Sequence, residues 1–257
     1  MILELQKELT YGPVRSRRLG ASLGINLFPG NIKRCPFDCV YCHFGWTQNK
    51  SSRLSRGIVP LPSPVEVEEA VRRALEDLPA LPAYITFSGN GEPTLHPDFP
   101  ELVDRVVSLR KKFQGRLRVA VLSNSAGIMQ PDVRAALTRL DVRIMKLDCG
   151  TEEVFRRYNR PIESLRLEAI TEGLIALAEA SPVVLQSLFA GGGEGNLEEK
   201  HVSTWIDRAQ RIVPAEVQIY TLARGYPAGD LRPASTVALA NLAAEALRRG
   251  VPVHVYQ

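Results

Sequence analysis

The sequence predicts an α/β fold in which parallel strands alternate with helices. Short runs of β-branched and apolar residues recur along the 257 residues, and segments with helix caps or helical spacing of apolar residues lie between them. Such alternation is typical of parallel strands joined by right-handed crossovers. The pattern alone fits both a doubly wound open sheet and a barrel, and in either architecture ligands gather at the carboxyl ends of the strands.

The first buried strand is expected over residues 19–28, because this segment is apolar, contains glycine and ends at Pro29-Gly30. The later strands are expected in short apolar runs at residues 83–88, 117–123, 142–147, 183–189 and 216–221, with 251–256 as a candidate last strand.

The first helix is expected over residues 64–78, where Ser63 and Glu66 form a capping box and Pro64 takes the first helical position. Later helices are expected at residues 99–112, 131–140, after 151, at 163–180 and 197–212, and from 235 to 250, with Asp98, Thr151 and Ser235 as caps. No internal repeat or low-complexity linker interrupts the series, so we expect a single domain over residues 1–257.

The most informative stretch contains Cys35, Cys39 and Cys42, three cysteines within eight residues. This spacing is too tight for a disulfide framework. Three thiolates without a fourth cysteine nearby suit a metal centre that keeps one coordination position open. A structural zinc site with His43 as fourth ligand is the alternative, but adjacent Cys42 and His43 can hardly both turn toward one tetrahedral ion.

Polar residues and glycines follow the expected strands. After the second strand, Gly89 and Gly91 allow backbone to approach a ligand closely, and Glu92 offers a carboxylate to an ammonium group. Asn90 lies between the glycines. Asn124, after the third strand, is expected either to form an Asx turn or to contact a ligand.

The later strand ends carry further candidates. Lys146 and Asp148 fall on one face of the fourth strand, where they are expected to pair, and Gln186 is a buried amide on the fifth. Tyr220 lies near the end of the sixth strand. Cys149 is expected either to act as a small buried hydrophobe or to donate a hydrogen atom to a substrate radical.

The cysteine spacing, with Tyr41 before the last cysteine, resembles the cluster loop of the radical S-adenosyl-L-methionine (SAM) superfamily. The string from Gly89 to Glu92 resembles that family's glycine-rich motif. The resemblance covers nearly the whole chain and implies a partial (β/α)6 TIM-like barrel. It also implies that Cys35, Cys39 and Cys42, in a loop of about residues 30–47, bind three irons of a [4Fe-4S] cluster while SAM chelates the fourth.

The resemblance further implies cofactor contacts for individual residues. The motif from Gly89 through Asn90 and Gly91 to Glu92 would hold the methionyl amino group, and Asp148 would bind the ribose. Remaining contacts to SAM are expected from Tyr41, Asn124, Gln186 and the backbone around Tyr220. Lys146 and Cys149 are the candidate catalytic residues.

The implied reaction is reductive cleavage of SAM to methionine and a 5′-deoxyadenosyl radical that abstracts hydrogen from a substrate. A flavodoxin or ferredoxin is the expected electron donor. The string from Gly12 to Asn26 resembles iron–sulfur oxidoreductases related to the wyosine-synthesising tRNA enzymes, but the second cysteine set of those tRNA enzymes is missing. An RNA nucleoside, a phosphorylated small molecule and a peptide therefore remain open as substrates. The alternatives are a glycyl-radical-enzyme activase and a non-catalytic zinc-containing nucleic-acid-binding module.

Charge and composition add weaker expectations. The net charge is +4, and a basic group flanks the cysteines: Arg15, Arg17, Arg18, Lys33, Arg34, Lys50, Arg53 and Arg56. This group is either a solvated surface or a rim that attracts an anionic substrate. The clustered cysteines fit a reducing compartment, and no apolar run of ~20 residues is present, so we expect a cytoplasmic location without membrane contact. Residues 190–196, rich in glycine, are expected to form a lid or a surface loop, and Arg160 is expected at the rim.

Overall fold

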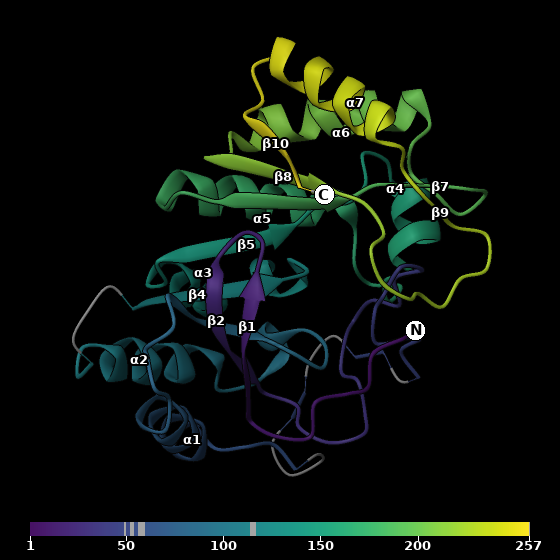
Figure 1. Ribbon diagram of the computed structural model, residues 1–257. Coiled ribbons are helices and arrows are strands. Elements are labelled where there is room, and N and C mark those ends of the chain that lie inside the picture. Colours follow the sequence, from purple (N-terminus) through teal and green to yellow (C-terminus); the bar gives the residue numbers. More distant parts are fainter. Residues whose placement is uncertain (49, 52–53, 56–59, 114–116, 257) are drawn as a thin grey trace.

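Eight strands form one sheet in the computed structural model, which describes residues 1–48, 50–51, 54–55, 60–113 and 117–256. The strand order is β1-β2-β3-β4-β5-β6-β8-β10; β1 and β2 are antiparallel, and each strand after β2 runs parallel to the one before it in this order. A doubly wound sheet would start near its middle and reverse direction. Here the order never reverses, so the strands wind one way like part of a TIM barrel (Figure 1).

Apart from β1, the strands of the main sheet agree closely with the expected runs. In the main sheet they are β1 (Thr10–Ser16), β2 (Gly20–Asn26), β3 (Tyr84–Ser88), β4 (Arg118–Ser123), β5 (Val142–Lys146), β6 (Val184–Leu188), β8 (Glu216–Tyr220) and β10 (Val253–Tyr256). Two short strands, β7 (Ala190–Gly191) and β9 (Arg232–Pro233), form a separate antiparallel pair.

The helices lie between the strands and pack mainly on their neighbours in the chain. The longer helices are α1 (Pro64–Glu76), α2 (Phe99–Arg110), α3 (Pro131–Thr138), α5 (Leu167–Ala180), α6 (Glu199–Ile212) and α7 (Thr236–Arg248). Shorter turns are η1 (Pro93–Leu95), η2 (Ala126–Met129), α4 (Glu152–Val154) and the π-helical η3 (Phe155–Asn159).

The expected caps are confirmed with one exception. Ser63 and Glu66 form the predicted capping box, and the side chains of Thr151 and Ser235 accept from backbone N–H groups in the first turns of α4 and α7. Asp98 takes the N-cap position of α2, but its side chain makes no capping hydrogen bond. The prediction for Asp98 was therefore wrong in its mechanism, although the helix begins where it was expected.

Strand β1 was not predicted. It pairs antiparallel with β2 at the edge of the sheet, and the register shifts between Tyr11 and Val14. Proline inside a strand is tolerated only at edges and bulges, because it cannot donate to the ladder. Because of Pro13, residues 10–16 do not have the pattern of a central strand. The strand that was predicted as the first is the second strand of a hairpin.

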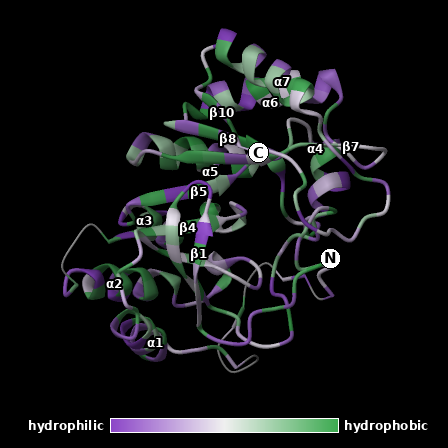
Figure 2. Cartoon of the chain, in the orientation of Figure 1, coloured by the Kyte–Doolittle hydropathy of each residue, from purple (hydrophilic) through white to green (hydrophobic). Residues whose placement is uncertain are grey.

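The core lies between the sheet and the helices that cover its outer face. Figure 2 shows hydrophobic residues along the central strands and hydrophilic residues on the outer sides of the helices. Side chains such as Phe87, Phe99 and Trp205 are almost completely buried there. No helix among the described residues is long and apolar enough to cross a membrane. The packed sheet fixes the strand ends, and with them the site described next.

Candidate active site

A cavity of about 540 Å³ opens at the carboxyl ends of the parallel strands. This volume lies within the range of ~300–1,000 Å³ that small-molecule sites usually occupy. All but two of the predicted site residues line it: Cys35, Cys39, Tyr41, Cys42, Gly89, Gly91, Glu92, Asn124, Lys146, Asp148, Gln186 and Tyr220. The tertiary fold thus gathers side chains from across the sheet into a single site.

Each of the three clustered cysteine sulfurs has a nitrogen donor 3.3 Å away. The pairs are Lys33 Nζ with Cys42 Sγ, Asn124 Nδ2 with Cys35 Sγ, and Asn159 Nδ2 with Cys39 Sγ. N–H groups directed at sulfur stabilise metal-bound thiolates and tune the potential of iron–sulfur clusters. The three thiols and their donors therefore fit a thiolate-bound cluster.

The three cysteines are partly exposed to solvent, and the pKa values of two of them are raised. Burial raises the pKa of Cys35 well above its ordinary value and raises the pKa of Cys39 to about 12, with neighbouring negative groups adding to both shifts. Coordination to iron would replace the proton, because a coordinating thiol is deprotonated outright. Among the described residues, no group of three or more His, Cys, Asp or Glu side chains is arranged around one metal ion. This finding covers Cys35, Cys39 and Cys42 as well, so it does not discriminate between a zinc site with His43 and a cluster.

The first cysteine is held next to the glycine-rich motif by backbone pairing. Arg34 donates its N–H to the carbonyl of Asn90 at 3.0 Å, and its own carbonyl accepts from the N–H of Glu92 at 2.9 Å. Gly91 lies between them with φ +130°, and a Cβ at this position would be 1.7 Å from the Arg34 oxygen. Only glycine allows this close approach, so Gly91 fixes the distance between the cysteine loop and Glu92.

Glu92 is a buried carboxylate with neutral partners. Its Oε1 accepts from the Thr94 hydroxyl at 2.6 Å, the Thr94 N–H at 3.1 Å and the Ser123 hydroxyl at 2.8 Å, while Oε2 accepts from the Asn124 N–H at 2.5 Å. Burial raises the pKa of Glu92, although these hydrogen bonds oppose the shift. A buried carboxylate without a cationic partner is suited to receive an ammonium group.

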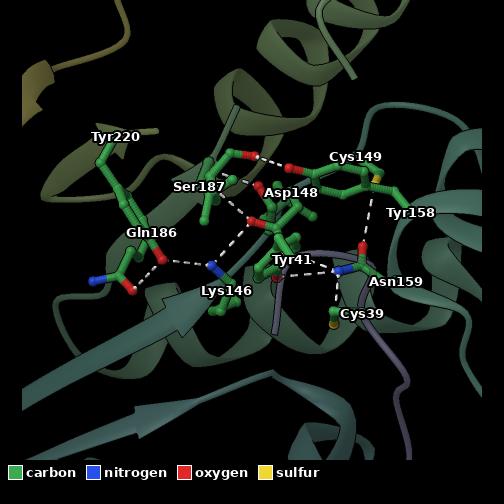
Figure 3. Close-up of polar contacts among 12 residues, drawn as sticks. Cys39, Tyr41, Lys146, Asp148, Cys149, Tyr158, Asn159, Gln186, Ser187 and Tyr220 are labelled. Atoms are coloured by element: carbon green, nitrogen blue, oxygen red, sulfur yellow. Dashed lines mark hydrogen bonds and ion pairs between the residues drawn. The ribbon is translucent and has the colours of Figure 1, made fainter. Parts of the chain in front are cut away.

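Asp148 is the centre of a second polar group (Figure 3). Its Oδ1 accepts from Lys146 Nζ at 3.1 Å and from the Leu188 N–H at 2.8 Å. Its Oδ2 accepts from Asn159 Nδ2 at 2.9 Å and from the hydroxyl of Tyr41. The expected pair of Lys146 and Asp148 is confirmed. Four donors occupy the carboxylate, so Asp148 is engaged in positioning the side chains around it.

Lys146 connects this group to the last strands. Burial alone would lower its pKa, but the carboxylate of Asp148 and the hydroxyl of Tyr220 outweigh burial, and the net pKa lies above the ordinary lysine value. Its Nζ lies 3.1 Å from Tyr220 Oη, and that hydroxyl also donates to Gln186 Oε1 at 3.3 Å. Gln186 Nε2 donates to Gln218 at 3.3 Å. Lys146 therefore stays charged at the cavity wall.

Asn90 and Cys149 are the two predicted residues that do not line the cavity. The Asn90 Nδ2 donates to the carbonyls of Gln6 at 2.7 Å and Phe28 at 2.9 Å, so its side chain holds the N-terminal segment against β2. The Cys149 thiol is buried and donates to Asn159 Oδ1 at 3.1 Å. Neither position supports the direct role that the sequence suggested.

Asn124 forms the expected Asx turn, and its contact to a ligand stays a prediction. Its Oδ1 accepts from the Ala126 N–H at 2.9 Å, which forms the Asx turn, and its Nδ2 faces Cys35. Asn159 and Ser123 were missed as site residues. Nothing in the sequence brings Asn159 near Cys39, which is 120 positions away. Ser123 looked like an ordinary strand end.

The basic group divides into several environments. Arg15, Arg17, Arg18 and Lys33 line the cavity, whereas Arg34 pairs with the glycine motif and Lys50 Nζ donates to the Arg160 carbonyl. Arg53 and Arg56 lie outside the described residues. A basic rim is thus present for part of the predicted set.

The glycine-rich loop of residues 190–196 is tied into the fold. Asn196 is buried, and its Nδ2 donates to the carbonyls of Asp148 at 2.8 Å and Leu188 at 2.9 Å. Arg160 pairs with Glu194 of this loop and lies over the Trp46 ring, with Cζ 4.6 Å from the ring centroid. None of residues 190–196 lines the cavity. The lid role stays a prediction.

Residues 32–205 match the family model of the Radical SAM superfamily. The chain belongs to this superfamily. Members use a [4Fe-4S] cluster and SAM, so these are its cofactors, and the donor-backed cysteines described above fit the cluster. Superfamily membership also indicates an enzyme, which disfavours a non-catalytic zinc module.

Among curated proteins, a UPF0026 protein of Methanocaldococcus jannaschii is 36% identical over 171 residues, which cover 66% of this chain and 50% of that protein. A UPF0026 protein of Helicobacter pylori is 32% identical over 174 residues, covering 66% of this chain and 52% of that protein. The chain therefore spans about half the length of the curated relatives it matches.

Solved structures share the fold at low identity. A radical SAM methyltransferase from Sphaerobacter thermophilus superposes with a TM-score of 0.67 at 14% identity, covering 91% of this chain and 65% of that one. A structure of TYW1 with a bound lysine-pyruvate adduct gives a TM-score of 0.61 at 16% identity, covering 88% of this chain and 73% of that one. At these identities the likeness concerns the fold alone, which is the predicted partial barrel.

Proposed function

We propose that this protein cleaves SAM reductively and uses the resulting 5′-deoxyadenosyl radical to abstract hydrogen from an anionic substrate. One observation carries the proposal. Three donor-backed thiols and the buried carboxylate of Glu92, whose partners are all neutral, converge on a single cavity at the strand ends. When bound, the cluster and SAM supply the electron transfer and the radical; the protein supplies binding, orientation and exclusion of water.

Each part of the site has a role in this proposal. Cys35, Cys39 and Cys42 hold the cluster as thiolates. Glu92 accepts hydrogen bonds from the ammonium group of SAM, which provides the positive charge that this carboxylate lacks inside the protein. The backbone at Gly91 keeps this carboxylate at a fixed distance from the first cysteine.

The opposite wall orients the rest of SAM. Asp148 acts as a positioning residue, since its four donors leave no free acceptor site. Lys146 uses two of its three N–H donors on Asp148 and Tyr220, and the third is left for a ligand in the cavity. Gln186 and Tyr220 line the wall beside it. An external one-electron donor of the flavodoxin or ferredoxin class completes the system.

The test is anaerobic reconstitution with iron and sulfide, followed by dithionite and SAM and mass spectrometry for 5′-deoxyadenosine. We expect product from the wild type and none from Cys39→Ala, which should also lose the cluster absorbance. Cys149→Ala is the matched control, because it removes a thiol outside the cavity and should keep the full iron content. Stoichiometric zinc in protein purified without oxygen, with no 5′-deoxyadenosine, would contradict the proposal.

A further inference from the structure

Arg18 lies in the turn between β1 and β2, and its side chain reaches the opposite edge of the sheet. Its Cζ is 4.2 Å from the centroid of the Tyr220 ring and 5.2 Å from that of Tyr256. These tyrosines end β8 and β10, so the first hairpin contacts the last two parallel strands. The hydroxyl of Ser16 holds the turn by accepting from the N–H groups of Arg18 at 3.2 Å and Leu19 at 3.1 Å.

The stagger of a barrel explains this contact. Strands of a TIM barrel tilt, and the register advances by ~8 residues over one full circuit. The start of β2 is therefore brought level with the ends of β8 and β10, although the sequence separates them by at least 200 positions. Figure 1 shows the hairpin in front of the central strands with its turn directed toward the C-terminal strand.

The guanidinium of Arg18 forms no ion pair with a carboxylate of the described residues. Its Nε and Nη2 are shielded from solvent, and neither has a hydrogen-bond acceptor among the described residues. Burial lowers the pKa of Arg18; Tyr220 and Tyr256 oppose this shift, and Arg17 adds to it. No carboxylate is among these groups. Shielding a cation with unpaired N–H groups from solvent costs free energy unless a bound anion pairs with it.

The cavity around Arg18 has an excess of positive charge. Three more arginines line it: Arg15, Arg17 and Arg224. Its described lining contains two carboxylates, Glu92 and Asp148. Asp148 is paired with Lys146, and under the proposed function Glu92 is paired with the ammonium of SAM. Within the described part of the chain no ion pair joins these arginines to a carboxylate, so they favour an incoming anion.

We propose that Arg18, held against the rings of Tyr220 and Tyr256, binds an oxyanion of the substrate, either a carboxylate or a phosphate. Stacking on the tyrosines fixes the plane of the guanidinium, and two parallel N–H groups then match two oxygens of the anion. This inference rests on the proposed function in one respect. SAM carries a single carboxylate; if that carboxylate binds at the cluster beside the ammonium group that Glu92 receives, the anion at the β8–β10 side belongs to the substrate.

The test follows the arginine Nε–H resonances of ¹⁵N-arginine-labelled, cluster-loaded protein. Inorganic phosphate and acetate are titrated separately at constant ionic strength, with and without SAM. We expect a saturable shift of the Arg18 resonance, which Arg18→Gln identifies by its loss. The tighter of the two probes indicates whether the substrate group is a phosphate or a carboxylate.

Binding of the probe by the variants is measured by calorimetry. Arg18→Gln should weaken binding of the probe at least ~10-fold, equal to about 1.4 kcal/mol. Arg18→Lys keeps the charge but loses the two parallel N–H donors, so its affinity should lie between those of Arg18→Gln and the wild type. Arg118→Gln is the matched control: Arg118 also lies against a tyrosine ring, that of Tyr84 at 5.4 Å, but it is exposed and outside the cavity. Its substitution should leave probe binding unchanged.

Two results would overturn the inference. One is no saturable shift of the Arg18 resonance with either anion. The other is a shift caused by SAM alone that blocks both probes, which would assign Arg18 to the SAM carboxylate. The 5′-deoxyadenosine assay separates the two proposals. Anion binding without that product refutes the proposed function but supports the anion site. Formation of the product without anion binding supports the proposed function and refutes the anion site.

Discussion

Replacing Asn159 with alanine tests whether one buried amide organises the cavity. Its Nδ2 donates to Asp148 at 2.9 Å and faces Cys39 Sγ and Tyr41 Oη at 3.3 Å, while its Oδ1 accepts from the Cys149 thiol (Figure 3). The strongest of these bonds has a carboxylate acceptor, and hydrogen bonds to charged groups contribute ~1.5–3 kcal/mol. The variant should therefore lose about 2–3 kcal/mol of stability.

The loss is measured as the thermal midpoint of the anaerobic, reduced protein. For a chain of this size 1 kcal/mol corresponds to ~2–4 °C, so the midpoint should fall by roughly 5–10 °C. Asn241→Ala, on the exposed face of α7, is the control and should shift the midpoint little. A fall no larger than in that control would refute the assignment of Asn159 as the organising residue.

A second readout of the same variant concerns the cluster. Removing an N–H donor from a cluster thiolate disfavours the reduced, more negative state, so the reduction potential of the reconstituted protein should become more negative. This shift does not follow from general destabilisation. An unchanged potential together with a lower midpoint would restrict Asn159 to a structural role.

Three further predictions concern other parts of the chain. Gly91→Ala should prevent cluster assembly, seen as a loss of bound iron, because a Cβ would meet the Arg34 oxygen at 1.7 Å; normal iron content would show that the loop has room to move. Glu92→Gln should weaken SAM binding at least ~10-fold in calorimetry, as expected for a charge-assisted bond, and unchanged affinity would remove Glu92 from the ammonium site. Arg211, helped by a second arginine of α6, lowers the pKa of Glu168 to about 2. The contribution of the Glu168 carboxylate to stability is therefore complete above the ordinary glutamate pKa and is lost as the pH falls toward 2. In Glu168→Gln the midpoint of denaturant unfolding should depend less on pH over that acidic range. The same pH dependence in the variant and the wild type would contradict this.

The local elements were predictable because their signals are local. The capping box before α1 and the apolar runs of the parallel strands give their positions within a few residues, since hydrophobic periodicity and caps depend on near neighbours. The cysteine spacing also indicates its chemistry directly, because thiols this close in the chain are close enough in space to bind one metal cluster. Strand β1 escaped prediction because Pro13 is incompatible with a central strand and acceptable only at an edge, and edges are decided by the whole sheet.

The sequence by itself determined the fold class and identified the three clustered cysteines and most of the other predicted residues that line the cavity. Only the tertiary structure decided which of these side chains meet. The N–H donors behind the cysteine sulfurs come from separate segments, Asn90 and Cys149 turned out to face the protein interior, and Arg18 joins the first hairpin to the last strands. The physical reason is that hydrogen bonds and charge pairs depend on distances of a few ångströms. Barrel winding and strand stagger set those distances between positions that lie far apart in the chain.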